Sequence, residues 1–129
     1  MNLLLEIFGG AVAAVGTIFI TRKKYPHAEF KLYSLYLFIA ALIYVVFLFS
    51  GGDFWWQIIE FGGVIIYGMI ALVSYQKNLP KLLGLGWLFH GFWDLLLHNA
   101  IDTPFVPEAY PGICLGFDVI MAIYIFRTL

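Results

Sequence analysis

Long, nearly uncharged apolar segments are the feature that most constrains the fold of this 129-residue chain. A helix needs roughly 20 apolar residues to cross a bilayer, and several stretches approach that length. They are separated by short segments rich in Gly, Pro, Asn and charged residues, which are typical of turns. Because each stretch is continuously apolar rather than alternating, helices are favoured over barrel strands. The expected spans are residues 3–20, 30–49, 54–75, 82–98 and 110–126.

The composition agrees with a membrane protein. Hydrophobic residues make up 63% of the chain and charged residues 12%, whereas soluble domains have about 45–50% and about 25%. A net charge of −1 and a single cysteine argue against a nucleic-acid partner and a disulfide scaffold. We therefore expect one all-α domain, a polytopic helical bundle of five spans. Its expected location is a bacterial-type inner membrane or its equivalent, with membrane lipid as its surroundings.

The basic residues predict the orientation of the bundle. They border the connections after the first and third spans, or follow the fifth span: Arg22, Lys23, Lys24, Lys31, Lys77, Lys81 and Arg127. Because consecutive spans alternate in direction, all of them fall on one side of the membrane. The positive-inside rule places that side in the cytoplasm, so that the N-terminus lies outside and the C-terminus inside. An even number of spans would break this pattern.

Ionisable residues inside the spans gather in one layer. At about 1.5 Å per helical residue, all of them lie within about 12 Å of the outer boundary. They are Glu6, Glu60, His90, Asp94, His98 and Asp118. This layer contains no Lys or Arg, and a carboxylate in lipid costs at least about 2.5–3.5 kcal/mol. We therefore expect it to hold cations or protons.

A histidine and aspartate stripe in the fourth span suggests a metal site. His90, Asp94 and His98 are spaced i, i+4 and i+8, on one face of a helix. Neighbouring pairs can share a metal ion, while the two histidines are about 12 Å apart along the axis. We expect one such pair to be completed by Glu60, Asp118 or Glu6 from neighbouring helices, or a dinuclear site to use the whole stripe. Imidazole with carboxylate suits zinc, iron or manganese, and zinc or iron is the expected cofactor.

These features favour a metal-dependent enzyme acting on a lipid or isoprenoid-like substrate. Glu60 and Asp94 are the expected catalytic groups, and Glu6 is an additional candidate. Aromatic side chains would hold the apolar substrate: Phe92, Trp93 and Phe117.

Two other functions fit the same residues. Intramembrane carboxylates also occur in cation or proton transporters, although these acids occupy only the outer half and transporter sites usually lie near the midplane. In a non-catalytic assembly protein, the polar layer would instead join helices by hydrogen bonds. A homo-oligomer could then complete a half-site.

One short segment resembles known membrane enzymes. His90-Gly91-Phe92-Trp93-Asp94 is similar to the HGxxD-type stretches of polytopic, iron-dependent enzymes, including the carotene-cleaving dioxygenases related to bacteriorhodopsin. The histidine and aspartate ligand set is also similar to that of zinc-dependent membrane hydrolases, such as alkaline ceramidases and adiponectin-receptor proteins. Both resemblances imply metal chemistry on an apolar substrate.

Overall fold

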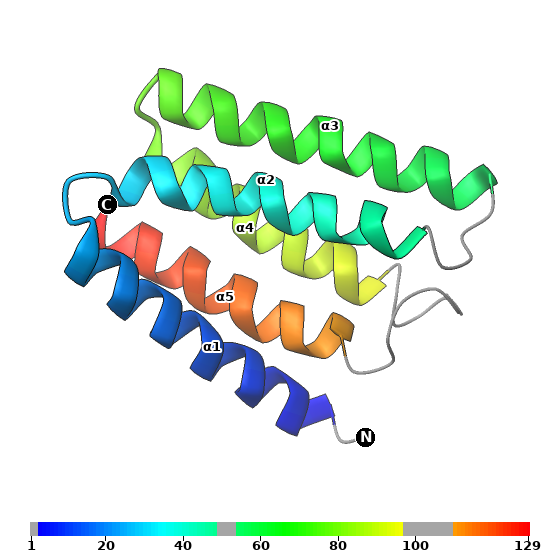
Figure 1. Cartoon of the computed structure of the whole chain (residues 1–129), viewed down its shortest axis with the longest axis horizontal. Coiled ribbons are helices and arrows are strands. Elements are labelled where there is room, and N and C mark those ends of the chain that lie inside the picture. Colours follow the sequence, from blue (N-terminus) through cyan, green and yellow to red (C-terminus); the bar gives the residue numbers. More distant parts are fainter. Residues whose placement is uncertain (1–2, 49–53, 97–109) are drawn as a thin grey trace.

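Five helices that alternate in direction form the described part of the chain. The computed structural model describes residues 3–48, 54–96 and 110–129 (Figure 1). The helices are α1 (Leu3–Lys24), α2 (Glu29–Leu48), α3 (Phe54–Gln76), α4 (Pro80–Asp94) and α5 (Tyr110–Thr128). The all-α prediction is confirmed. Because the directions alternate, α1, α3 and α5 begin at one end of the bundle, and α2 and α4 begin at the other.

The lengths of the helices identify a small membrane protein. Four of them, α1, α2, α3 and α5, are long and apolar enough to cross a membrane. The fourth helix, α4, has 15 residues, fewer than the roughly 20 that a full crossing needs. Its expected continuation from residue 97 to residue 98 lies outside the described residues. A multi-pass membrane protein is therefore supported, while the expected fifth span remains a prediction.

Charged residues and proline determine where two of the helices end or begin, and the pattern of apolar residues does not show this. The first helix continues to Lys24, beyond the expected limit at residue 20, and its last turn carries three basic residues. Cations at a helix C-terminus interact favourably with its dipole. The fourth helix begins at Pro80 rather than at residue 82, because proline fits the first turn, where its missing N–H is not needed.

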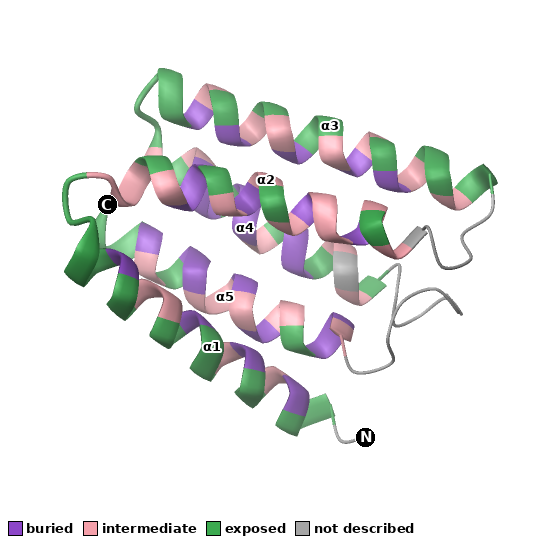
Figure 2. Ribbon diagram, in the orientation of Figure 1, coloured by how far each residue is buried: buried purple, intermediate pink, exposed green. Residues whose placement is uncertain are grey.

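The fifth helix lies between α1 and α4 and packs on both. The second and third helices pack on each other, α3 also contacts α4, and α1 contacts α2 only slightly. Figure 2 shows a buried face on each helix turned toward the others. The largest fully buried side chains include Trp87, Tyr33, Tyr44, Leu37 and Leu83. Outward-facing side chains such as Phe8, Ile65 and Phe89 are apolar and exposed, as expected for a surface in contact with lipid.

Glycines allow α5 to approach its two neighbours closely. A Cβ atom on Gly10 would overlap the carbonyl of Ile113, and one on Gly116 would overlap the carbonyl of Ile7. Small residues at such crossings let the backbones of membrane helices come together. On the other side of α5, a Cβ on Gly91 would lie 3.1 Å from the Cβ of Asp118. This second contact brings α4 close to α5 at the candidate site.

The arrangement also gathers the basic residues at one end. The connection from α1 to α2, the connection from α3 to α4 and the C-terminus lie at the same end of the bundle (Figure 1). These are the places where the lysines and arginines occur in the sequence.

Candidate functional site

A buried histidine–aspartate pair joins α4 to α5. The Nδ1 atom of His90 lies 2.8 Å from Oδ2 of Asp118, and both side chains are buried. The adjacent Gly91 permits this contact, because a side chain at that position would press against Asp118. A carboxylate at Nδ1 fixes the orientation of an imidazole ring. The contact therefore holds His90 and Asp118 in a fixed arrangement within the bundle.

Aromatic rings and a third ionisable group surround His90 on its other side. The ring of Tyr67 packs edge-on against the imidazole, with centroids 4.9 Å apart, and Trp93 packs edge-on against Tyr67 at 5.8 Å. Glu60 of α3 is also buried. These side chains line one small chamber that is too narrow to admit a water molecule, together with neighbours from α2 and α3: Ala41, Tyr44, Glu60, Gly63, Tyr67, His90 and Trp93. The chamber therefore places Glu60 and His90 on the same enclosed space.

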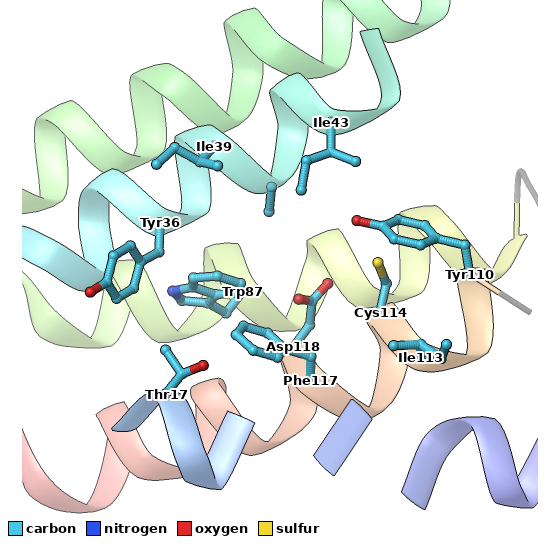
Figure 3. A pocket seen from close by; sticks show the side chains of 11 residues that line it. Thr17, Tyr36, Ile39, Ile43, Trp87, Tyr110, Ile113, Cys114, Phe117 and Asp118 are labelled. Carbon is cyan, nitrogen blue, oxygen red and sulfur yellow. The ribbon is translucent and has the colours of Figure 1, made fainter. Parts of the chain in front are cut away.

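A larger cavity also has Asp118 in its wall. It has a volume of about 280 Å³ and is bounded by α1, α2, α4 and α5 (Figure 3). Its lining is mostly apolar: Thr17, Tyr36, Ile39, Ala40, Ile43, Trp87, Tyr110, Ile113, Cys114, Phe117 and Asp118. Figure 3 shows the Asp118 carboxylate and the Cys114 thiol on the side of the cavity that faces Ile43. Asp118 is thus shared between the cavity and His90.

The cavity wall also contains a buried donor. Trp87 is fully buried, and its Nε1 atom has no hydrogen-bond partner within the described segments of the chain. Buried N–H groups are nearly always paired in native proteins, and exceptions call for an explanation. A ligand atom that accepts a hydrogen bond in the cavity would supply that partner.

These positions define what the site can do chemically. A molecule in the cavity meets Asp118, Asp118 contacts His90, and His90 lines the chamber that also contains Glu60. Side chains within hydrogen-bond reach of one another can pass a proton between a bound molecule and the protein. The arrangement places two hydrogen-bonded ionisable side chains beside an apolar cavity.

Three of the six ionisable residues expected in one layer come together in the structure: Glu60, His90 and Asp118. Glu6 is buried elsewhere, against Gly112 in the first turn of α5. That contact is on the face of α5 turned toward α1. The side chain of Asp94 and the whole of His98 lie outside what the structure describes.

The aromatic candidates occupy three different surroundings. Phe117 lines the cavity, and Trp93 lines the chamber. Phe92 is 45% exposed on the outer side of α4. The structure therefore places one of the three against the space where we expect an apolar ligand.

Metal ligands are incomplete in the described residues. Within residues 3–48, 54–96 and 110–129, no group of three or more His, Cys, Asp or Glu side chains is placed to hold a metal ion. A centre of the expected kind would also draw on Asp94 or His98, which the description does not cover.

A second polar cluster was not anticipated from the sequence. At the end of the bundle that carries the basic residues, Oε1 of Glu29 accepts hydrogen bonds from the hydroxyls of Tyr33, at 2.9 Å, and Tyr124, at 2.6 Å. The Glu29 and Tyr33 spacing of i, i+4 is a usable signal. Tyr124, Tyr67 and Trp87 stand in apolar runs, where nothing distinguishes a lining aromatic residue from a packing one.

Comparison with known proteins gives the family of the chain. No curated protein and no solved structure matches it. One family model matches residues 1–128. The match covers the five described helices and includes both His90 and Asp118. The chain therefore belongs to DUF6010, a family of unknown function.

Proposed function

We propose that this chain is a membrane-embedded enzyme that transfers a proton to or from a lipid- or isoprenoid-like molecule bound in the cavity. One observation carries the proposal. The carboxylate of Asp118 lines an apolar cavity, while its Oδ2 atom lies 2.8 Å from Nδ1 of a buried histidine.

The cavity favours an apolar substrate that comes from the bilayer. Its volume of about 280 Å³ is near the lower limit of small-molecule sites, about 300 Å³. Ile39 and Ile113 line it and are themselves exposed, so the cavity reaches the surface of the bundle. Since α1 and α2 contact each other only slightly, we propose that a chain-like molecule enters between them.

The buried donor narrows the substrate class further. The indole N–H of Trp87 would donate to an oxygen atom of the bound molecule. A hydrocarbon alone would leave this donor without a partner, which costs about 1–3 kcal/mol. We therefore propose an apolar chain that carries a hydroxyl, carbonyl or ester oxygen.

The ionisable residues have distinct roles in this proposal. Asp118 contacts the substrate and accepts or donates the proton. His90 is a positioning residue, because it contacts Asp118 and does not line the cavity. Glu60 lies beyond His90 and would exchange protons with it across the chamber. In a low-dielectric interior such contacts are stronger than in water.

Binding of farnesol, a chain-like isoprenoid alcohol, tests the substrate class. The full chain is purified in detergent, and equilibrium binding of radiolabelled farnesol is measured. We expect saturable binding that is lost in Ile43→Trp, because the larger side chain fills the cavity. Ile65→Trp is the matched control, since Ile65 is exposed on α3. Equal binding by the two variants would contradict the proposed cavity site.

Product formation tests the role of Asp118. Wild type and Asp118→Asn are incubated with a lipid and isoprenoid extract of bacterial membranes, and the extract is compared before and after by mass spectrometry. We expect a product with wild type and none with Asp118→Asn, although farnesol binding persists in that variant. A product formed equally by both proteins would remove Asp118 from the chemistry.

A metal centre is a second candidate, favoured by the same histidine–carboxylate contact. Histidines that bind metals usually donate their other ring nitrogen to a carboxylate or carbonyl oxygen. In this version Asp118 orients His90, and His90 and Glu60 would hold the ion, with Asp94 and His98 as further expected ligands. Zinc or iron would then polarise the substrate or activate water.

Metal analysis separates the two versions. Purified protein is measured by mass spectrometry of its metals, before and after addition of zinc or iron. The metal version predicts stoichiometric binding that is lost in Glu60→Gln and kept in Glu29→Gln, a carboxylate at the other end of the bundle. Absence of binding under both conditions would overturn the metal version and leave the proton-transfer proposal in place.

A further inference from the structure

A second surface feature lies where α1 and α5 end. The two helices begin at the same end of the bundle, so that their C-termini also lie together (Figure 1). Their facing sides line a groove of about 400 Å³. The same pattern occurs on both walls, with two apolar or aromatic residues followed one turn later by an arginine: Ile18, Phe19 and Arg22 on α1, and Ile123, Tyr124 and Arg127 on α5.

The groove is apolar along its length and cationic at its end. Phe19 and Ile123 are exposed, as are both arginines. No salt bridge links Arg22 or Arg127 to a carboxylate in the part of the chain that is described. Glu29 lies nearby, and its carboxylate accepts hydrogen bonds from two tyrosine hydroxyls, one of them that of Tyr124. Two exposed guanidinium groups therefore lie on the walls of the groove, and neither forms a salt bridge within the described residues.

We propose that this groove binds one anionic glycerophospholipid. An acyl chain would lie along α1 and α5, and the phosphate would lie between Arg22 and Arg127. A guanidinium group matches phosphate with two parallel hydrogen bonds. Anionic lipids are concentrated in the cytoplasmic leaflet, on the side where the positive-inside rule places these residues. The site is independent of the proposed enzymatic function.

A neighbouring groove gives an internal comparison. It also has a volume of about 400 Å³, lies between α2 and α3, and carries Lys31 as its one basic lining residue. An ammonium group is a point charge without the planar fork of arginine. The groove between α1 and α5 is therefore expected to discriminate more strongly in favour of a phosphate headgroup.

Lipid titration with native mass spectrometry tests the site. The full chain in neutral detergent is titrated with dioleoylphosphatidylglycerol and with dioleoylphosphatidylcholine, which share their acyl chains. We expect wild type to prefer the anionic lipid by roughly tenfold or more, since each basic residue near the surface favours anionic lipid. The double variant Arg22→Gln with Arg127→Gln should lose this preference. The matched control, Lys77→Gln with Lys81→Gln, removes the same charge at the same end of the bundle and should keep it.

Other outcomes would overturn the proposal. These are equal binding of the two lipids, equal losses in the arginine and lysine variants, or displacement of the lipid by millimolar inorganic phosphate, which would indicate a headgroup site alone. Arginines in a last helical turn also stabilise the helix end. The result for the arginine variant is therefore interpreted only if that variant is folded. Ile123→Trp therefore serves as a second variant, which fills the groove and leaves both charges. Undiminished binding of the anionic lipid by Ile123→Trp would equally overturn the lipid site.

Discussion

A polar side chain buried between membrane helices depends on the groups that it touches. Asp118 touches His90, and the rest of its surroundings include the apolar cavity and Gly91. Because water is excluded from such a position, a side chain that loses its partner there cannot be stabilised by solvation instead. The stability of the bundle and its chemistry therefore depend on the same contact.

Removing one partner should cost more than removing both. We expect His90→Leu to lower the free energy of unfolding by about 3–5 kcal/mol, because it leaves a buried carboxylate without its contact. Adding Asp118→Leu to that variant should recover part of the loss, since no polar group then remains uncompensated. Detergent-induced unfolding of the single and double variants measures the difference. Additive losses would show that the two side chains are not coupled.

Trp87 offers a test at a single hydrogen bond. Trp87→Phe removes the buried indole N–H while keeping an aromatic ring in the cavity wall. We expect farnesol binding to weaken about fivefold, the equivalent of about 1 kcal/mol for one hydrogen bond. Binding of farnesene, which has no oxygen, should be unchanged. An equal effect on both molecules would mean that Trp87 contributes only shape.

Spacing in the sequence predicted a neighbour for His90 on its own helix and left its partners on other helices open. The structure pairs His90 with Asp118 of α5, and the side chain of Asp94 lies outside the described residues. Which acid faces the histidine depends on the rotation of α4 and α5 about their axes and on the close approach at Gly91. Neither quantity can be obtained from hydropathy. The scarcity of charge did identify Glu60, His90 and Asp118 as the residues to examine.

At the scale of single elements, α1 is held mainly by α5. It contacts α2 only slightly, and much of its surface is exposed. Its attachment therefore rests on the crossing at Gly10, Gly112 and Gly116. A side chain at Gly10 or Gly116 would separate the two backbones, because the nearest atoms belong to the main chain and cannot rotate away.

The glycine crossing should be intolerant of even a small side chain. We expect Gly116→Val to destabilise the protein by about 1–3 kcal/mol or more, since its Cβ would overlap the backbone of α1 at Ile7. Gly9→Ala is the matched control, because nothing lies within 4 Å of a Cβ there. It should be neutral, or stabilising by roughly 0.5–1 kcal/mol. Thermal unfolding in detergent compares the variants, and similar melting of Gly116→Val and wild type would contradict the crossing.

The helices themselves were predictable, because the length of each apolar segment can be counted in the sequence. The expected segments 54–75 and 110–126 differ from α3 (Phe54–Gln76) and α5 (Tyr110–Thr128) only at their C-terminal ends. Ends that fall among polar residues were less predictable. Lys24 continues α1 where hydropathy has already fallen, since a helix in the interfacial region does not need apolar side chains to satisfy its backbone hydrogen bonds.

At the scale of the whole molecule, charge is distributed along the bundle axis. The lysines and arginines lie at one end, while Glu60 lies near the start of α3, at the other end. If the five helices of the described residues are the membrane spans, the two chain termini must lie on opposite sides, because five is an odd number. The status of α4, which has 15 described residues, therefore decides the topology.

Reporter fusions test the orientation directly. We expect green fluorescent protein fused after Leu129 to fluoresce, since the positive-inside rule places Arg127 and the C-terminus in the cytoplasm. A cysteine introduced at Asn2 should react with an impermeant maleimide in intact cells, and one at Asn78, in the connection between α3 and α4, should react only after lysis. Both cysteines are introduced into a Cys114→Ala background, so that the native thiol does not react with the maleimide. If Asn2 and Leu129 were found on the same side, α4 would not cross the membrane, and the chamber that contains Glu60 and His90 would have to be assigned to a bundle of four spans.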